Sequence, residues 1–403
     1  MKIMFAVPSY WPSQDGVASI TKYLAEGLAE RKHEVLVYTS AGNGGLQVLP
    51  EQEHHGGAAI ERIRVYVRWP LRLKGRDADS TQEKYYERVC SFKPDVLIVV
   101  CAQTWTLDWI IPYLEEIRCA KVFYSHGYSL LSKQDQIWEQ FRHRNILGVY
   151  ENWKIRRYYR KLYKEIEKFD LAIYLSELNN SYLYGKEHML SNGRVLENAI
   201  EDVFFDEKIR QEDDICDKDS VDYLFIANYS ENKNHKMLIE AFVKAEIGKS
   251  HLIFAGFERN QYLDDLQKYS QKLLSECADK EVIYNVHLER EEIIDLYRTS
   301  DVFVCPSKSE TWSIVAHEAA AAAMPIISTD VGIYSEITGS IIVHSVEEMK
   351  EIMEELYYDP DARRKHGESA HQWLMDKGCR VKDKVDWLEE ELKRLCVERR
   401  QCE

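Results

Sequence analysis

The chain has 403 residues, more than one compact core usually holds, and this length predicts two domains. Its formal net charge of −15 argues against a nucleic-acid-binding protein, and the lack of an uninterrupted run of about 18 apolar residues argues against a membrane-spanning helix. The nine cysteines are scattered without a CxxC pair, and the opening MKIMFAVPSY turns polar too soon for a secretory signal. We therefore expect a cytoplasmic protein with reduced thiols, without a disulfide framework or a zinc site.

Apolar segments alternate with helical patterns along the first half of the chain. The segment KIMFAV precedes a turn-rich loop, after which Ile20, Leu24 and Leu28 recur at the fourfold spacing of a helix. EVLVYT is the next expected strand, and such a βαβ unit predicts a parallel sheet with helices on both faces. The series of expected strands continues with DVLIVV (95–100), KVFYS (121–125) and DLAIYLS (170–176).

A second series of the same kind follows an acidic segment, 199–220, that has no apolar periodicity and that we interpret as a linker. The series comprises VDYLFIA, NHKMLIEAFVKA, SHLIFAG, EVIYNV and REEIIDLYRTS. The last segment places four apolar residues on one helical stripe, Val385, Leu388, Leu392 and Leu395. We expect an N-terminal domain (1–205), a C-terminal domain (206–375) and a terminal helix (376–403) that returns to the first domain.

The stretch 307–329, SKSETWSIVAHEAAAAAMPIIST, combines acidic residues with the start of an alanine-rich helix. Glu310 and Glu318 bracket a loop and this helix start, directly after the apolar segment DVFVCPS. The free amides of a helix start bind anions, phosphates above all, whereas a carboxylate accepts hydrogen bonds from sugar hydroxyls. Together they describe a site for a sugar nucleotide. The alternative is two solvated glutamates beside a helix dipole.

This stretch resembles the E-x7-E motif of the large GT-B retaining glycosyltransferase family of the family 4 type (glycosyl transferases group 1), typified by sucrose-phosphate synthase and bacterial lipopolysaccharide mannosyltransferases. NYSENKNHKMLIEAF is similar to the family segment with a phosphate-binding Arg and Lys, and RVLENAIEDVFF and PSYWPSQDGVASITKYLAEGLAERKHEVLVYTS are similar to two further motifs. The resemblance covers nearly the whole chain. It implies an α/β protein with two doubly wound, Rossmann-like domains that face a central cleft.

The resemblance implies a role for each residue that matches a motif. Glu318 would hold the ribose of the donor, Glu310 would contact the donor sugar, and Lys233 would neutralise the leaving diphosphate. His126 lies where the family often has a histidine near the reacting sugar, although a structural histidine after a strand is an equal alternative. The other implied donor-binding residues are Gly16, Asn228, Thr311, Trp312, Ser313 and Ile314.

Four positions depart from the family pattern. Asn228 stands where the family usually has its first phosphate-binding arginine, so stabilisation of the leaving group would depend on Lys233. Asp15, Ser313 and Ile333 each stand where the family has a glycine. These departures leave the identity of the donor open.

The implied activity is retaining transfer of a sugar from a nucleoside diphosphate sugar, with UDP or GDP, to a glycan or lipid-linked glycan in surface-polysaccharide assembly. The donor phosphate would take the proton of the acceptor, and we expect no metal or other cofactor. The sequence DAD at 77–79 is interpreted as a solvated loop. The alternatives are a GT-B nucleotide-sugar epimerase or hydrolase, and a catalytically degenerate binding protein.

The segment 138–168 is a basic region, with nine Lys and Arg, four Glu and a local charge of +5. Five apolar residues in and just after it fall on a helical stripe, Ile155, Tyr159, Leu162, Ile166 and Phe169. One hypothesis is a helix that contacts anionic lipid at the inner face of the membrane. The alternative, which we favour for the stripe, is a helix that packs on the core with its basic face in water.

Overall fold

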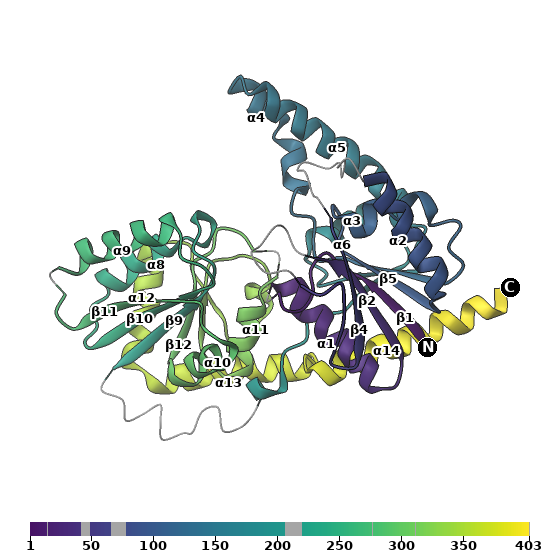
Figure 1. Cartoon of the computed structure of the whole chain (residues 1–403). Helices are drawn as coiled ribbons and strands as arrows, with labels where there is room; N and C mark the ends of the chain where they lie inside the picture. Colours follow the sequence, from purple (N-terminus) through teal and green to yellow (C-terminus); the bar gives the residue numbers. More distant parts are fainter. Residues whose placement is uncertain are drawn as a thin grey trace. The chain divides into compact units, whose positions relative to one another are not determined.

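The computed structural model describes residues 1–13, 15–41, 49–65, 78–205, 220–275, 277–310 and 312–402 (Figure 1). The chain divides into two compact units. Unit 1 comprises Met1–Ala199 and Val381–Glu403, and unit 2 comprises Ile200–Arg380. Within the described residues, no helix has both the length and the apolar character needed to cross a bilayer.

Unit 1 is built on an eight-stranded sheet with the order β3-β4-β2-β1-β5-β6-β7-β8. All neighbouring strands are parallel except β3 and β4, which are antiparallel. Every residue of β5 and of β6 is buried, as expected for parallel strands covered on both faces. The strands are β1 (Lys2–Ala6), β2 (Glu34–Ser40), β3 (Gln52–His55), β4 (Ala58–Ile63), β5 (Val96–Val100), β6 (Ala120–Tyr124), β7 (Leu171–Tyr174) and β8 (Gly193–Val195).

The C-terminal helix α14 (Val381–Cys402) belongs to unit 1 and packs on α1 (Gly16–Glu30). All four members of its apolar stripe are buried. A Cβ atom on Gly27 would lie 2.6 Å from Cγ2 of Val385, so the glycine allows the close approach of the two helices. His33 and Glu389 are hydrogen-bonded at 2.9 Å at the end of this contact. The other helices of the unit are α2 (Ala78–Phe92), α3 (Trp105–Asp108), α4 (Ile137–Arg142), α5 (Ile146–Ile166) and α6 (Asn180–Glu187).

Unit 2 contains a six-stranded, wholly parallel sheet with the order β11-β10-β9-β12-β13-β14. The strands are β9 (Val221–Ile226), β10 (Ser250–Gly256), β11 (Lys280–Val286), β12 (Val302–Cys305), β13 (Ile326–Ser328) and β14 (Ile341–Ile342). The helices are α8 (His235–Lys244), α9 (Gln261–Leu274), α10 (Arg290–Thr299), α11 (Ile314–Ala321), α12 (Val346–Tyr358) and α13 (Pro360–Asp376). The predicted doubly wound α/β architecture is thereby confirmed for both units.

The direction of strand order reverses once in each sheet. In unit 2 the chain leaves β9 toward β10 on one side and returns to β12 on the other, so the reversal lies between β9 and β12. In unit 1 the reversal lies between β1 and β5. Ligands of doubly wound sheets bind beyond the carboxyl ends of the strands at this point. For unit 2 the fold therefore predicts a ligand site at the loops that follow β9 and β12.

The contact between α1 and α14 gives a test of the packing of unit 1. Gly27→Leu places a side chain against Val385, and we expect it to lower the free energy of unfolding by roughly 1–3 kcal/mol through overpacking. The effect should shrink in the Val385→Ala background. Urea denaturation checks both, with Glu30→Leu on the exposed side of α1 as the control that changes stability by less than about 0.5 kcal/mol. Equal losses for the two leucine variants would contradict the close approach.

Candidate functional site

Lys233 and Glu310 form an ion pair beyond the carboxyl ends of β9 and β12. Nζ of Lys233 lies 2.6 Å from Oε1 of Glu310. Lys233 ends a short 3₁₀ turn after β9, and Glu310 lies in the loop after β12. Because β9 and β12 are parallel neighbours, the two loops leave the sheet at the same edge. The side chains are 24% and 13% exposed, so the pair is partly desolvated and still open to solvent.

Three further hydrogen bonds fix the geometry of this pair. The hydroxyl of Ser307 donates to Oε1 of Glu310 at 2.7 Å. The side-chain amide of Asn232 donates to the carbonyl of Ser309 at 2.9 Å, and the backbone N–H of Lys308 donates to the carbonyl of Asn232 at 2.8 Å. The two loops are therefore joined at Asn232, the residue next to Lys233. Lys233 and Glu310 are thus held next to each other before any ligand binds.

A third loop, after β13, also reaches Glu310. Gly332 has φ +57°, and a Cβ atom there would lie 2.9 Å from Cβ of Glu310. Glycine suits this position both because the backbone is left-handed and because a side chain would displace the glutamate. The neighbouring Ile333 is buried, and the hydroxyls of Ser313 and Tyr334 lie 2.8 Å apart. This last contact ties the start of α11 to the same loop.

Glu318 lies in α11, and its carboxylate is held by α10. Arg290 donates to Oε1 at 2.6 Å, and the hydroxyl of Tyr297 donates to Oε2 at 2.8 Å. Arg290 also donates to Glu201 at 2.9 Å and lies over the ring of Phe204. Glu318 is only 3% exposed, and burial together with its charge holds the pKa of the Tyr297 hydroxyl well above its usual range. The tyrosine therefore remains a donor at any ordinary pH.

Sequence reasoning missed Arg290 and Tyr297, which lie far from Glu318 in the chain. No spacing rule connects α10 with α11. The available signal was chemical: a carboxylate inside an alanine-rich helix is costly to bury unless cationic or hydroxyl donors reach it. The sequence also assigned no role to Ser307, the first residue of the stretch 307–329, although its hydroxyl donates to Glu310.

The start of α11 is capped by Ser313, whose hydroxyl accepts from the backbone N–H of Ala316 at 3.3 Å. Ile314 is the first residue of the helix. Trp312 is buried, with its ring stacked on His317 at 4.7 Å between centroids. Asn228 is exposed in the loop that follows β9. Thr311 lies outside the described residues.

The remaining two candidates, Gly16 and His126, lie in unit 1. Gly16 begins α1, and Asp15 caps this helix by accepting from the backbone N–H groups of Val17 and Ala18 at 3.0 Å each. His126 follows β6. Burial lowers the pKa of its imidazole to about 4 against a smaller opposing effect of Asp15, and its buried Nε2 has no hydrogen-bond partner among the described residues. The imidazole is therefore neutral near pH 7.

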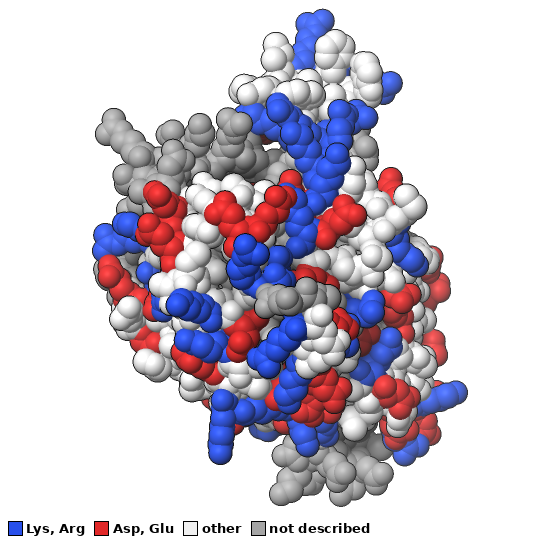
Figure 2. Space-filling model, turned by 90° about the vertical axis from the view of Figure 1, so that its right-hand side faces the viewer, with Lys and Arg blue, Asp and Glu red and all other residues white. Residues whose placement is uncertain are grey.

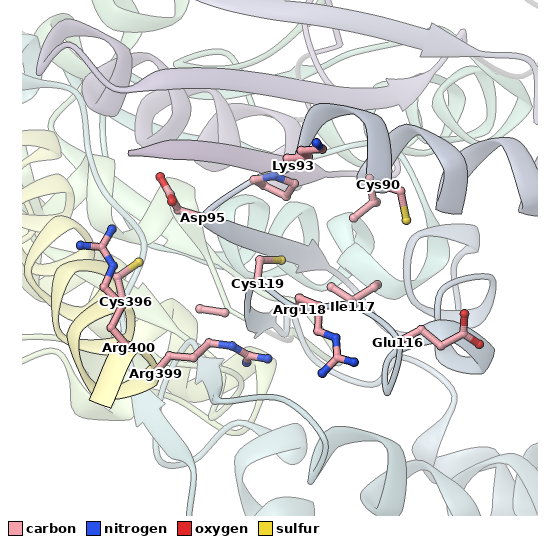
Figure 3. A pocket seen from close by; sticks show the side chains of 13 residues that line it. Cys90, Lys93, Asp95, Glu116, Ile117, Arg118, Cys119, Cys396, Arg399 and Arg400 are labelled. Atoms are coloured by element: carbon pink, nitrogen blue, oxygen red, sulfur yellow. The ribbon is translucent and has the colours of Figure 1, made fainter. Parts of the chain in front are cut away.

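Unit 1 contains a pocket of about 450 Å³, whose lining side chains are shown in Figure 3. It lies before the amino ends of β5 and β6 and beside the end of α14. Its lining includes Asp95, Cys119 and Arg399. None of the candidate residues contributes to it. We therefore treat this pocket as separate from the candidate site.

The described residues contain no group of three or more His, Cys, Asp or Glu side chains that could hold a metal ion. Asp77, the first residue of the DAD sequence, lies outside the part of the chain that the structure describes, whereas Ala78 and Asp79 begin α2, so the interpretation as a loop is wrong for these two residues.

Comparison with known families assigns both halves of the chain. Residues 206–373 match the model of Glycosyl transferases group 1. Residues 14–183 match the model of Glycosyltransferase Family 4. An uncharacterized glycosyltransferase of Methanocaldococcus jannaschii is 24% identical over 362 residues, which cover 84% of this chain and 82% of that protein.

Solved structures share the fold over the whole length. Sucrose-phosphate synthase from Thermosynechococcus elongatus matches with a TM-score of 0.75 and 16% identity, covering 98% of this chain and 99% of that one. Anabaena HepE in complex with UDP matches with a TM-score of 0.70 and 16% identity, covering 98% and 100%. The two family models together account for both units, and the chain belongs to the glycosyltransferases of the GT-B fold.

Proposed function

We propose that the protein is a retaining glycosyltransferase that moves a hexosyl group from a nucleoside diphosphate sugar to a glycan or lipid-linked glycan acceptor. The observation that carries the proposal is the Lys233–Glu310 pair, fixed at the reversal point of the sheet in unit 2. HepE has been solved with UDP and with UDP-glucose, which makes uridine diphosphate sugars the first donors to test. The proposed setting is surface-polysaccharide assembly on the cytoplasmic side of the membrane.

The ion pair suggests how a donor would be received. A diphosphate that enters the site competes with Glu310 for the ammonium group of Lys233, because both are anions. Once Lys233 turns to the diphosphate, Oε1 of Glu310 keeps the hydrogen bond from Ser307 and can accept another from a sugar hydroxyl. As the glycosyl–phosphate bond breaks, negative charge grows on the diphosphate, and the placed cation lowers the barrier.

Glu318 is suited to the ribose because its carboxylate is already oriented. Arg290 and Tyr297 each occupy one site on one carboxylate oxygen. A carboxylate has about four acceptor sites, so sites remain for hydroxyl groups of the ligand. Arg290 and Tyr297 would act as positioning residues, which hold Glu318 without touching the reacting atoms.

Two departures from the family pattern have structural explanations. Asp15 caps α1 and Ser313 caps α11, so both side chains are engaged with helix ends. A third departure remains, because the side-chain amide of Asn228 carries no charge where the family usually has an arginine. We propose that Lys233 and the helix start at Ser313 supply the positive potential at the diphosphate, that the donor phosphate takes the acceptor proton, and that transfer needs no added divalent ion.

The Lys233 variant tests the proposed function directly. Lys233→Ala should lower kcat by about 100-fold or more while weakening donor binding much less, because the charge on the diphosphate grows only as the bond breaks. Lys233→Arg should retain part of the turnover. Product formation from UDP sugars and calorimetric donor binding give the two quantities. Wild-type turnover in the alanine variant would rule out the assigned role.

The stereochemistry and metal requirement are read in the same assay. Proton NMR of the first product, recorded before mutarotation, gives the anomer, and EDTA tests the need for a divalent ion. An inverted product, or activity lost in EDTA and restored by manganese, would contradict the proposed mechanism. Donor hydrolysis that is independent of any acceptor would instead indicate a hydrolase.

The Glu318 network predicts different effects for two arginines of α10. Arg290→Ala should lower the free energy of unfolding by roughly 1.5–3 kcal/mol and weaken UDP binding, because it removes a charged hydrogen bond to a buried carboxylate. Arg298→Ala is the matched control, since it breaks only an exposed pair with Asp295 and should cost less than about 0.5 kcal/mol. Urea denaturation and calorimetry measure both. Indistinguishable variants would show that Arg290 does not hold Glu318.

His126 is half-buried, with its Nε2 shielded from solvent, and this position predicts a dependence of stability on pH. The pKa of its imidazole is about 4 in the folded protein and about 6.5 in the unfolded chain, so between these values only the unfolded chain gains a proton. Its contribution is therefore fully present above pH 6.5 and is lost as the pH falls toward 4. His126→Gln should flatten the curve in this window, as measured by urea denaturation at a series of pH values. Parallel curves would show a solvated imidazole.

A further inference from the structure

Helices α4 and α5 form a hairpin that extends outward from the sheet of unit 1 (Figure 1). Six large apolar side chains at its outer end are between 49% and 82% exposed. We call them the apolar tip: Trp138, Phe141, Ile146, Leu147, Tyr150 and Trp153. Exposed apolar residues that occur singly are normal, whereas a group of this size marks an interaction surface.

Helix α5 has two faces with different roles. The expected core stripe is buried throughout, from Ile155 to Phe169, which confirms the core-packing interpretation of those residues. The outward face is apolar over the first turns of the helix, and it becomes basic toward the body of the unit. Its exposed cations are Arg156, Arg157, Arg160, Lys161 and Lys164. The sequence hypothesis located these charges and Trp153, and it missed the other apolar residues beyond them.

The apolar and basic residues form one continuous surface. The rings of Trp138 and Phe141 meet edge to face at 6.2 Å, and those of Tyr150 and Trp153 are stacked at 6.4 Å. Nζ of Lys154 lies over the ring of Tyr150 at 4.1 Å. Tryptophan and tyrosine rings with cations beside them suit a boundary between an apolar and an aqueous phase.

Charge favours an anionic partner. The segment 138–168 carries +5 in a chain of −15, and Figure 2 shows a run of Lys and Arg along the projecting part of the molecule. The rest of the chain therefore sums to about −20, so the hairpin has the opposite sign of charge to the rest of the chain taken together. A convex apolar tip inserts into a fluid lipid layer without requiring a preformed groove.

We propose that this hairpin docks the protein on a membrane surface that contains anionic lipid, with the apolar tip in the boundary between headgroups and acyl chains. At a rise of about 1.5 Å per residue, Lys154 lies about 12 Å along α5 from Ile146. The cations of the outward face thus follow the apolar tip and meet the lipid phosphates. This is peripheral binding, and it is independent of the donor site in unit 2.

Binding of the full chain to vesicles tests the proposal. Phosphatidylcholine vesicles with and without phosphatidylglycerol are sedimented with the protein at low and high salt. The tip variant carries Ile146→Ser and Leu147→Ser, and the charge variant carries Arg156→Gln, Arg157→Gln, Arg160→Gln and Lys161→Gln. The control variant carries Met375→Ser and Val397→Ser, two exposed apolar residues outside the hairpin.

We expect the wild type and the control to bind phosphatidylglycerol vesicles equally, with affinity that falls steeply with salt. The tip variant should bind at least about tenfold more weakly, and the charge variant should lose its preference for phosphatidylglycerol. Donor turnover by the tip variant should equal that of the wild type, which separates this test from that of the proposed function. No binding by the wild type at low salt, or equal binding by the tip variant, would overturn the proposal. A lipid-free dimer that the tip variant converts to a monomer would assign the surface to a second copy of the chain.

Discussion

The candidate site depends on one partly buried ion pair, Lys233 with Glu310. Each charge loses part of its hydration at the edge of the sheet, and that loss is offset only because the partner charge and the hydroxyl of Ser307 are in place. Hydrogen bonds from the side chain and to the carbonyl of Asn232 hold the two loops together, so the charges meet without further ordering. In the donor-free protein the cation is therefore neutralised. Any anionic ligand has to bind Lys233 more strongly than a glutamate that is already positioned, which sets a threshold against weak anions.

The two carboxylates of the motif are held in different ways, and the difference fits different tasks. Glu310 accepts from Lys233, a partner that can turn to a ligand, and it lies against a loop that Gly332 allows to approach closely. Glu318 is buried and fixed by Arg290 and Tyr297, whose hydroxyl keeps its proton. Because Glu318 is more deeply buried than Glu310, moving its carboxylate costs more free energy. Glu310 is suited to a contact that changes during the reaction, and Glu318 is suited to a contact that stays the same.

Much of the architecture could be predicted from the sequence, because alternating apolar segments and helical stripes specify parallel strands with helices on both faces. The meeting of Lys233 and Glu310 follows from the same rule, since neighbouring parallel strands end at one edge. The partners of Glu318 could not be predicted, because they depend on how α10 packs against α11. Asp15 and Ser313 were interpreted as losses of glycine, although Asp and Ser before a helical segment are also ordinary helix caps. The surroundings of His126, which follows β6, depend on other elements of unit 1.

The hairpin of α4 and α5 shows how charge decides between the surfaces that an apolar patch could bind. Its exposed rings and aliphatic side chains would favour contact with a second copy of the same hairpin, since the removal of apolar surface from water lowers the free energy. The cations of α5 lie beside that surface, so two hairpins that approach each other bring like charges together. An anionic lipid surface removes this repulsion and replaces it with attraction, while it still offers an apolar layer to the rings. The same set of side chains therefore disfavours pairing of tips in solution and favours a membrane, and this preference weakens as salt screens the charges.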